Sequence, residues 1–215
     1  MSDTNVHPGL DVARLDWKGL NFWELGSRLY AIVQGNPGLE ADFPGITQRY
    51  ATPLTVTGLL WERLKQMRDS GGKFVAYIVF YGQKAIGVAT VEQDELCEQS
   101  EESNPPPVAV GPWLAYWLDD QRPEAQRHLG VAMLRLIAHD IIRNSKNAAM
   151  FERPFTLVRP DNSRSLSILA NPNNGFGGFV IPPASEAKLY VAPTAKTPML
   201  LVKGNLTLDE LRRAA

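Results

Sequence analysis

One six-residue stretch has the residue types and spacing to hold a phosphate group. It reads Arg127-His128-Leu129-Gly130-Val131-Ala132 and fits the pattern [Gln/Arg]-x-x-Gly-x-[Gly/Ala] at the start of an apolar helical segment. The first amides of a helix have no intrahelical partner, and the macrodipole adds partial positive charge, so backbone groups there bind an anion. Gly130 and Ala132 would leave room for it. Because so short a pattern also arises by chance, its surroundings decide its meaning.

Histidine and cysteine offer no comparable site. His128 and His139 are eleven positions apart, which on a helix separates them by about 16 Å and prevents shared binding of one metal ion. The chain has three histidines and one cysteine, with no His-Glu-x-x-His or paired-cysteine pattern, so we expect no metal site. Cys97 stands near Glu95 and Glu98, whose charges disfavour a nucleophilic thiolate.

Length and composition bound the fold and the partners. The 215 residues are the size of one domain, and we divide it into a loop-rich part (1–52), a core (53–181) and C-terminal strands (182–215). Lysine and arginine number 22 against 23 aspartate and glutamate residues, so the net charge is −1. This balance argues against nonspecific binding of nucleic acid or an anionic membrane. The 44% of apolar residues predict a packed core.

The sequence points to the cytoplasm. A single cysteine makes no intramolecular disulfide, so the fold needs no oxidising compartment. The N-terminus has no basic and apolar leader, and Arg135, His139 and Asp140 interrupt the most apolar stretch. We therefore expect neither secretion nor a membrane span.

The first half of the chain reads as helices followed by a hairpin. A short helix is predicted near 22–32 among the loops of 1–50, and a second over 53–69, where Thr52 is a capping residue and Pro53 opens the helix. Residues 74–81 and 84–91 predict a β-hairpin. The segment 92–102 holds six acidic residues in eleven positions, so we expect a solvated loop that does not continue the strand.

The second half alternates strands and helices. We predict strands at 108–118 and 155–158, helices at 126–144 and 161–169, and short strands at 179–181, 188–191 and 199–203, with a helical turn at 206–213. This order predicts an α/β (mixed α+β) domain, in which a mixed central sheet carries helices on both faces.

The order of the motifs resembles the GCN5-related N-acetyltransferase (GNAT) family over about residues 54–181. The hairpin, the strand at 113–118 and the segment 127–132 follow one another as in that family. Residues 158–165, Val-Arg-Pro-Asp-Asn-Ser-Arg-Ser, then resemble a second signature, Asn-x-x-[Ala/Ser] leading to Gly-Phe, here Gly175-Phe176 or Gly178-Phe179. Two motifs in order are more specific than one.

The resemblance implies acetyl-coenzyme A as cosubstrate and direct transfer of its acetyl group to a primary amine, with no covalent acyl-enzyme. Residues 127–132 would hold the pyrophosphate, and the backbone near Leu118 would bind the pantetheine arm and the thioester carbonyl. Asn162 and Ser165 would complete the cofactor site. The acceptor would be a small-molecule or peptide amine. Whether the protein forms a homodimer is left open by the sequence.

The resemblance leaves the catalytic acid and base open. The family often places a tyrosine seven residues after the helix asparagine, but here that position is Leu169. Ser165, Ser167, Tyr190 or water could replace the acid. For the base, Asp119, Asp120 and Glu92 are near the strand ends, although each also reads as a solvated loop carboxylate. We name Asp119 and Tyr190 as catalytic candidates.

One alternative function competes with this one. The missing tyrosine also suits a GNAT-fold module that binds acyl-coenzyme A or a protein partner without efficient catalysis.

The aromatic residues of the strand at 113–118 also have two interpretations. Trp113 and Trp117 could line an acceptor pocket, yet bulky residues on a central strand more often pack in the core. Tyr116 points away from Trp117 in a regular strand, so we expect one of the two to face the ligand.

Overall fold

The structure is a computed structural model that describes residues 7–97, 107–119, 129–144, 148–183, 189–190, 199–205 and 210. Arg127, His128 and the predicted helical turn at 206–213, apart from Glu210, lie outside these residues. Among the described helices, none is long and apolar enough to cross a membrane.

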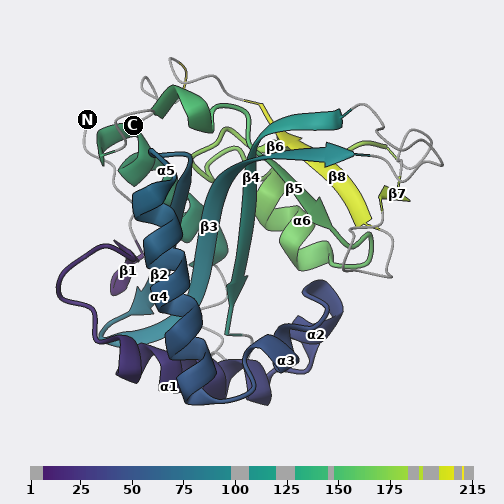
Figure 1. Ribbon diagram of the computed structural model, residues 1–215. Helices are drawn as coiled ribbons and strands as arrows, with labels where there is room; N and C mark the ends of the chain where they lie inside the picture. Colours follow the sequence, from purple (N-terminus) through teal and green to yellow (C-terminus); the bar gives the residue numbers. More distant parts are fainter. Residues whose placement is uncertain are drawn as a thin grey trace.

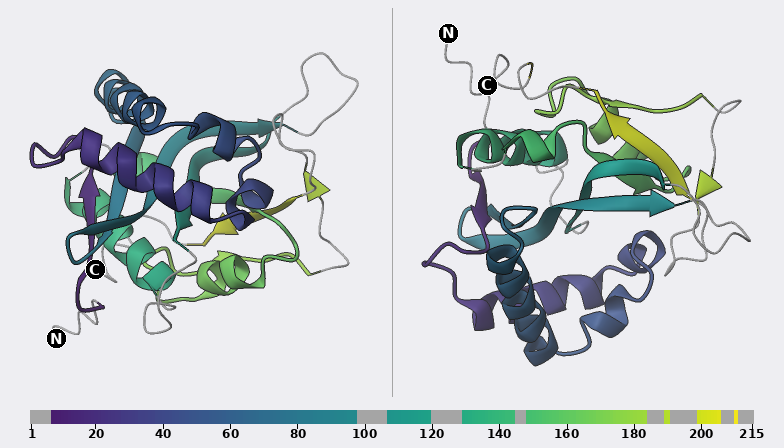
Figure 2. Two further views of the ribbon diagram at one scale, coloured as in Figure 1. Left: turned by 90° about the horizontal axis from the view of Figure 1, so that it is seen from below. Right: turned by 45° about the horizontal axis from the view of Figure 1, so that its top comes forward.

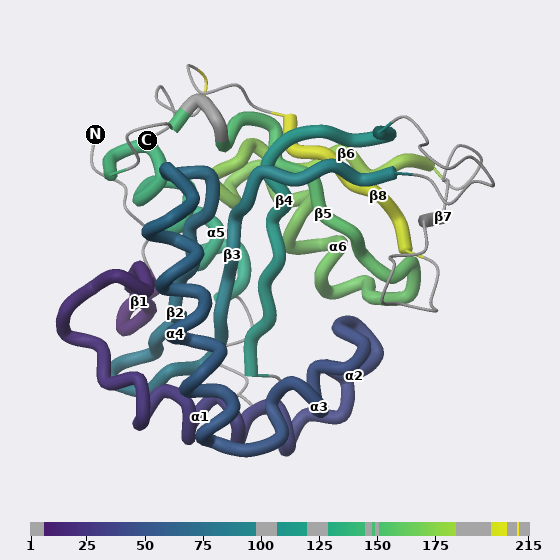
Figure 3. Tube along the Cα trace, viewed as in Figure 1, coloured from purple at the N-terminus to yellow at the C-terminus, as the bar shows by residue number. Residues whose placement is uncertain are grey.

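An eight-stranded sheet forms the centre of the molecule (Figure 1). Its strands lie in the order β1-β2-β3-β4-β5-β8-β6, with β7 paired to β8. Their bounds are β1 (Leu10–Arg14), β2 (Phe74–Tyr81), β3 (Lys84–Cys97), β4 (Pro107–Leu118), β5 (Phe155–Val158), β6 (Phe179–Val180), β7 (Leu189–Tyr190) and β8 (Met199–Gly204). Only the β4–β5 pair among these is parallel, so the predicted mixed sheet is confirmed. Figure 3 shows β1 beside β2 at one edge and β8 in the other half.

Helices lie on both faces of this sheet, as predicted (Figure 2). One face carries α1 (Phe22–Gly35) and α4 (Pro53–Asp69), and α2 (Gly38–Asp42) and α3 (Ile46–Arg49) connect these two helices. The other face carries α5 (Leu129–Asn144) and α6 (Ser163–Ala170). A short 3-10 helix, η2 (Ala148–Phe151), follows α5.

Local sequence signals explain how the α1–α4 pair forms. Thr52 Oγ1 accepts a hydrogen bond from the Thr55 amide at 3.1 Å, and Pro53 occupies the first turn of α4, where its missing N–H costs nothing. The two helices meet at Gly26, where a Cβ atom would lie 2.9 Å from the carbonyl oxygen of Pro53. Only glycine therefore permits this close approach.

Strands β4 and β5 separate soon after they meet. Their register contains one pair, Trp113 with Phe155, and the two rings stack with centroids 6.2 Å apart. Beyond Trp113, β4 continues to Leu118 along β3 alone, and Figure 1 shows it running away from β5. The β5-facing backbone groups of this part of β4 consequently have no strand partner. We call this place the β4–β5 split.

The predicted end of the second hairpin strand was wrong. Strand β3 does not stop at residue 91 but continues to Cys97, because β4 supplies a backbone partner for every residue of Glu92–Leu96. The acidic side chains Asp94 and Glu95 remain exposed on this ladder. The rest of the acidic segment, 98–106, lies outside the described residues.

The N-terminal part holds more structure than one helix among loops. Strand β1 pairs with β2 from Leu10 opposite Tyr81 to Arg14 opposite Tyr77. Helices α2 and α3 are only five and four residues long. Elements this short carry too little periodicity to be predicted from the sequence, because tertiary contacts rather than propensity hold them.

Candidate active site

A cavity of about 730 Å³ lies at the β4–β5 split. It is lined from one side by α2, α3 and α4 and by side chains of β3 and β4. From the other side it is lined by the end of β5 and by α6, through residues such as Ser165, Ile168 and Leu169. The cavity therefore reaches both faces of the sheet through the split.

On the α4 face, the floor of the cavity consists of cross-strand pairs of β3 and β4. Opposite residues of an antiparallel ladder project to the same face. The floor pairs are Val88 with Trp117, Thr90 with Ala115, and Glu92 with Trp113. Tyr50, which follows α3, packs edge-on against Trp117 with ring centroids 6.1 Å apart. Both tryptophans therefore line the cavity, and Trp117 is also part of the core.

Glu92 is the carboxylate of this floor. Burial raises the pKa of Glu92 above 4.5, and the charge of Asp94 adds to this, while the guanidinium of Arg63 opposes it. The Gln66 amide donates a hydrogen bond to Glu92 Oε2 at 3.4 Å. The expectation that Glu92 is a solvated loop carboxylate was wrong, because β3 extends past it and α4 covers it.

On the α6 face, Tyr116 and Ser165 lie together at the split. Their hydroxyl oxygens are 3.0 Å apart, joining β4 to α6. Burial raises the pKa of Tyr116 to about 12, against the opposing effect of the Ser165 hydrogen bond, so the phenol stays protonated at neutral pH. The backbone N–H of Ser165 donates to Asn162 Oδ1 at 2.9 Å, which caps α6. Tyr116 thus faces opposite to Trp117, as expected from strand alternation.

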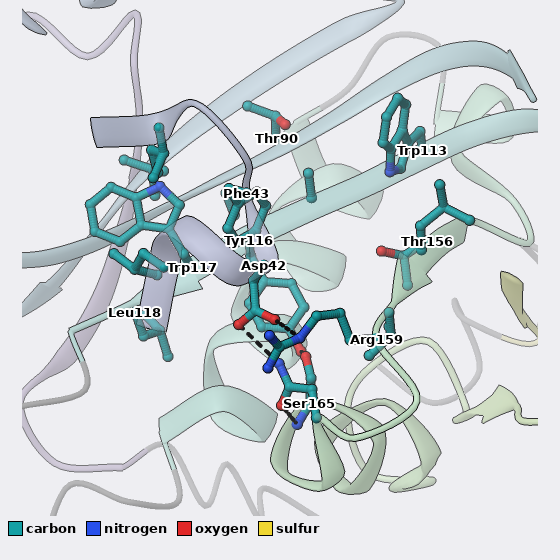
Figure 4. Close-up of a pocket in the computed structure, with 18 of the residues that line it drawn as sticks. Asp42, Phe43, Thr90, Trp113, Tyr116, Trp117, Leu118, Thr156, Arg159 and Ser165 are labelled. Carbon is teal, nitrogen blue, oxygen red and sulfur yellow. Dashed lines mark hydrogen bonds and ion pairs between the residues drawn. The ribbon is translucent and has the colours of Figure 1, made fainter. Parts of the chain in front are cut away.

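Asp42 joins the two sides of the cavity (Figure 4). Its Oδ1 is 3.0 Å from Arg159 Nε, and its Oδ2 accepts a hydrogen bond from Asn162 Nδ2 at 3.1 Å. Arg159 also lies 3.2 Å from Asp161. Because Asp42 ends α2 while Arg159 and Asn162 lie between β5 and α6, these contacts hold a helix of the α4 face against the α6 side.

The structure brings three of the predicted cofactor residues into the cavity lining: Leu118, Asn162 and Ser165. Leu129, Gly130, Val131 and Ala132 form the first turn of α5, while Arg127 and His128 lie outside the described residues. Gly130 was expected to give clearance to a phosphate. A Cβ atom there would contact Ile168, with 3.0 Å to its Cγ1, so this glycine also permits α5 to pack on α6, and the clearance for a phosphate stays a prediction.

The two catalytic candidates are placed differently. Asp119 is not among the residues that line the cavity; its Oδ2 lies 3.8 Å from the guanidinium of Arg28 on α1. The backbone of Tyr190 pairs with Met199 in β7 and β8, and its side chain lies outside the described part of the chain, as does Asp120. Leu169, at the position of the family's usual tyrosine, is fully buried and lines the cavity.

No group of three or more histidine, cysteine, aspartate or glutamate side chains lies where it could hold a metal ion, within the ranges that the structure describes. The free Cys97 is exposed at the end of β3.

Sequence reasoning missed the roles of Tyr116 and Asp42 in this site. Tyr116 had a signal, since strand alternation placed it opposite Trp117, but its partner Ser165 is 49 residues away. Asp42 had no such signal in the sequence, because 120 residues separate it from Asn162 and α2 itself was not predicted. Contacts at such separations depend on the complete fold.

Comparison with known proteins gives a clear result for the fold alone. No protein-family model matches this sequence, and no curated protein matches it either. Solved structures do match: RimJ of Mycobacterium smegmatis, in complex with CoA-disulfide, has 17% identity and a TM-score of 0.60, with 94% of this chain and 83% of that chain covered. RimL, a ribosomal alpha-N-protein acetyltransferase in complex with coenzyme A, has 14% identity and a TM-score of 0.63, with 94% and 96% covered.

A third match is AAC(6')-Ib in complex with ribostamycin and coenzyme A, at 14% identity and a TM-score of 0.58, with 94% of this chain and 96% of that chain covered. These identities are low, but each match spans nearly the whole chain. The separation of parallel strands between two helix layers agrees with the fold that the motifs predicted. This chain therefore has the fold of the GCN5-related N-acetyltransferases.

Proposed function

We propose that this protein transfers the acetyl group of acetyl-coenzyme A to a primary amine, directly within a ternary complex. The observation that carries the proposal is the cavity that reaches both faces of the sheet through the β4–β5 split. Such a cavity lets a thioester and an amine approach each other from opposite sides. Similar structures with coenzyme A bound support the identity of the cosubstrate.

The α6 side suits the cosubstrate. The β5-facing backbone groups near Leu118 have no strand partner and could bind the pantetheine arm and polarise the thioester carbonyl. Ile168 and Leu169 supply an apolar wall, and Ser165 supplies a hydroxyl. A Cβ atom on Gly130 would meet Ile168, so the first turn of α5 lies beside this end of the cavity. We retain the pyrophosphate site at residues 127–132 as part of the proposal.

The α4 side then receives the acceptor, and Glu92 is the base. An amine attacks only in its neutral form, so a carboxylate must accept its proton directly or through water. Glu92 lines the cavity on this side, and its raised pKa brings it nearer to the range useful for proton transfer. Glu92 takes the place of Asp119 in this proposal, because Asp119 does not line the cavity and lies beside Arg28.

Ser165 and Tyr116 protonate the departing thiolate. The amine nitrogen forms a bond to the acetyl carbon while the carbon–sulfur bond breaks, and the sulfur takes a proton from Ser165. Tyr116, whose hydroxyl lies 3.0 Å from that of Ser165, replaces this proton. After the products leave, water reprotonates Tyr116 and Glu92 releases the proton of the amine to water, so the enzyme returns to its starting state. The pair supplies a hydroxyl donor where Leu169 cannot, and it takes the place of Tyr190.

The acceptor in this proposal is a small molecule or a peptide, and the reaction takes place in the cytoplasm. The location is supported by the single cysteine, Cys97, which leaves the fold independent of disulfides.

Thermal denaturation and thiol release together test the proposal. Acetyl-coenzyme A should raise the melting temperature, because it binds the folded chain. With a panel of primary amines as acceptors, free thiol should then be released from acetyl-coenzyme A at a rate proportional to the enzyme concentration. A binding module without catalysis would show the shift in melting temperature but no thiol release above background with any amine. That outcome would overturn the proposed activity.

A further inference from the structure

Two guanidinium groups line the acceptor side of the cavity. Arg49 ends α3 and Arg63 lies on α4, and both belong to the cavity lining together with Tyr50. Both positive charges reach the Tyr50 hydroxyl, since each lowers its pKa against the burial that raises it. The phenol therefore stays protonated and can donate a hydrogen bond near both cations.

Arg63 has neutral partners. Its Nη1 donates to Gln66 Oε1 at 2.7 Å, and its guanidinium lies 5.4 Å from the ring centroid of Phe74. Its charge also acts on Glu92, which accepts a hydrogen bond from the Gln66 amide at 3.4 Å. Within the described chain, Arg63 has no carboxylate within ion-pair distance.

Arg49 is exposed and likewise forms no ion pair with another described residue. Hydrogen bonds from Thr47 and Gly45 lower the pKa of Glu40, and the charge of Arg49 contributes less to this lowering. Glu40 accepts hydrogen bonds from Thr47, at 3.0 Å from its amide and 2.7 Å from its hydroxyl, and also from the Gly45 amide. The carboxylate of Asp42 is bound to Arg159.

The acceptor side of the cavity consequently presents two cations that form no ion pair with another described residue, with one carboxylate, Glu92, on its floor. We propose that the amine acceptor carries an anionic group, a carboxylate or a phosphate, which binds to Arg49 and Arg63 while its amine faces Glu92. This inference rests on the proposed function and names the acceptor class for the same site. Guanidinium groups suit this task, because they donate paired, charge-assisted hydrogen bonds to planar or tetrahedral oxyanions.

The surroundings fit a short linker between the two groups of such an acceptor. Phe43 and Trp117 both line the cavity, and Figure 4 draws both among its lining side chains. Their apolar surfaces would pack against methylene groups, while the Tyr50 hydroxyl would donate to the anion. Charge selects the acceptor, and packing sets the distance between its ends.

Matched acceptors test the inference. γ-Aminobutyrate and γ-aminobutyramide differ only in the charge of the distal group, and a short peptide with aspartate as its second residue is compared with its asparagine counterpart. Thiol-release kinetics and calorimetric binding without acetyl-coenzyme A are measured for each. We expect about a 10- to 100-fold preference for the anionic member of at least one pair. The pair that shows it distinguishes small-molecule from peptide acceptors. Equal use and equal binding within both pairs would overturn the inference.

Arginine variants assign the preference to the site. Arg49→Gln and Arg63→Gln should each reduce the anionic preference, measured as the ratio of anionic to neutral acceptor use, about 10-fold or more, while the KM for acetyl-coenzyme A stays the same. Arg68→Gln, an exposed arginine on the same helix as Arg63, should change neither. A preference unaltered in both variants would contradict the assignment. If no amine is acetylated but the anionic compound still binds through Arg49 and Arg63, the proposed function fails while the anion site stands.

Discussion

The hydroxyl groups of Tyr116 and Ser165 lie 3.0 Å apart across the β4–β5 split. One residue comes from the strand that leaves its neighbour and the other from the first turn of α6. The pair places a protonated phenol behind a serine that lines the cavity. In the proposed mechanism this pair is the proton donor for the departing thiolate.

Removing either hydroxyl should slow turnover. Loss of a general acid usually reduces the rate by about 10²–10⁴-fold, so we expect a fall in kcat of that order for Ser165→Ala and a smaller one for Tyr116→Phe. Ser167→Ala, an exposed serine of the same helix, is the control. Unchanged kcat in both variants would remove this pair from the mechanism.

Replacing Glu92 should remove one ionisation from the pH profile. Because burial raises the pKa of Glu92 above 4.5, the base is protonated at acid pH and kcat/KM rises as it ionises. Glu92→Gln should lose this rising limb and about 10²–10⁴-fold in rate. Glu95→Gln, on an exposed residue of the same strand, should keep both. An identical profile for Glu92→Gln would show that another group accepts the proton.

The same substitution should change stability in a direction set by pH. A carboxyl whose pKa is raised on folding favours the protonated native state, so its contribution is fully present below pH 4.5 and is lost as pH rises through the folded pKa. Glu92→Gln should therefore raise the unfolding free energy at neutral pH and give no gain at acid pH. Urea titrations at both pH values measure this difference. A loss of stability at neutral pH would contradict the raised pKa.

Asp42 should stabilise the position of α2. Its ion pair with Arg159 at 3.0 Å is partly shielded from water, with 27% and 23% of the two side chains exposed. Asp42→Ala should lower the unfolding free energy by about 1 kcal/mol and speed amide exchange in α2. Asp69→Ala, at an exposed position ending α4, is the control. A double-mutant cycle with Arg159→Ala should show coupling, and strict additivity would argue against the contact.

Gly130 should tolerate a side chain only if the Ile168 side chain moves. Gly130→Ala would place its Cβ against Ile168, so we expect a loss of about 1–3 kcal/mol in unfolding free energy. Ile168→Ala in the same chain should restore part of that loss by making room. Chemical denaturation of the two single variants and the double variant measures the effect. Equal losses with and without Ile168 would show that the contact does not limit the site.

Long, strongly patterned elements could be predicted from the sequence. Thr52 and Pro53 indicated the start of α4, and continuous runs rich in β-branched and aromatic residues identified β2 and β5 at their observed bounds. The end of β3 could not be found, because its acidic residues oppose strand formation locally and only pairing with β4 overrides that preference.

The candidate site was predictable only where its contacts are local in sequence. Asn162 and Ser165 belong to a helix-capping motif whose hydrogen bond joins residues three positions apart, so the sequence alone indicates it. Glu92, Arg63 and Asp42 meet the cavity only after α4 and α2 pack over the sheet. Pairings of this kind carry no local signature, since nothing in the neighbouring residues specifies a partner far along the chain.

Single turnover tests the central claim most directly. Enzyme, acetyl-coenzyme A and an amine acceptor are mixed in equal amounts, and mass spectrometry follows the acceptor and the protein while free thiol is measured. We predict one acetyl group on the amine for each thiol released, with no acetylated form of the enzyme at any time. Thiol release that yields acetate instead, an acetylated enzyme that precedes the product, or no acetylated amine at all would contradict direct transfer at the β4–β5 split.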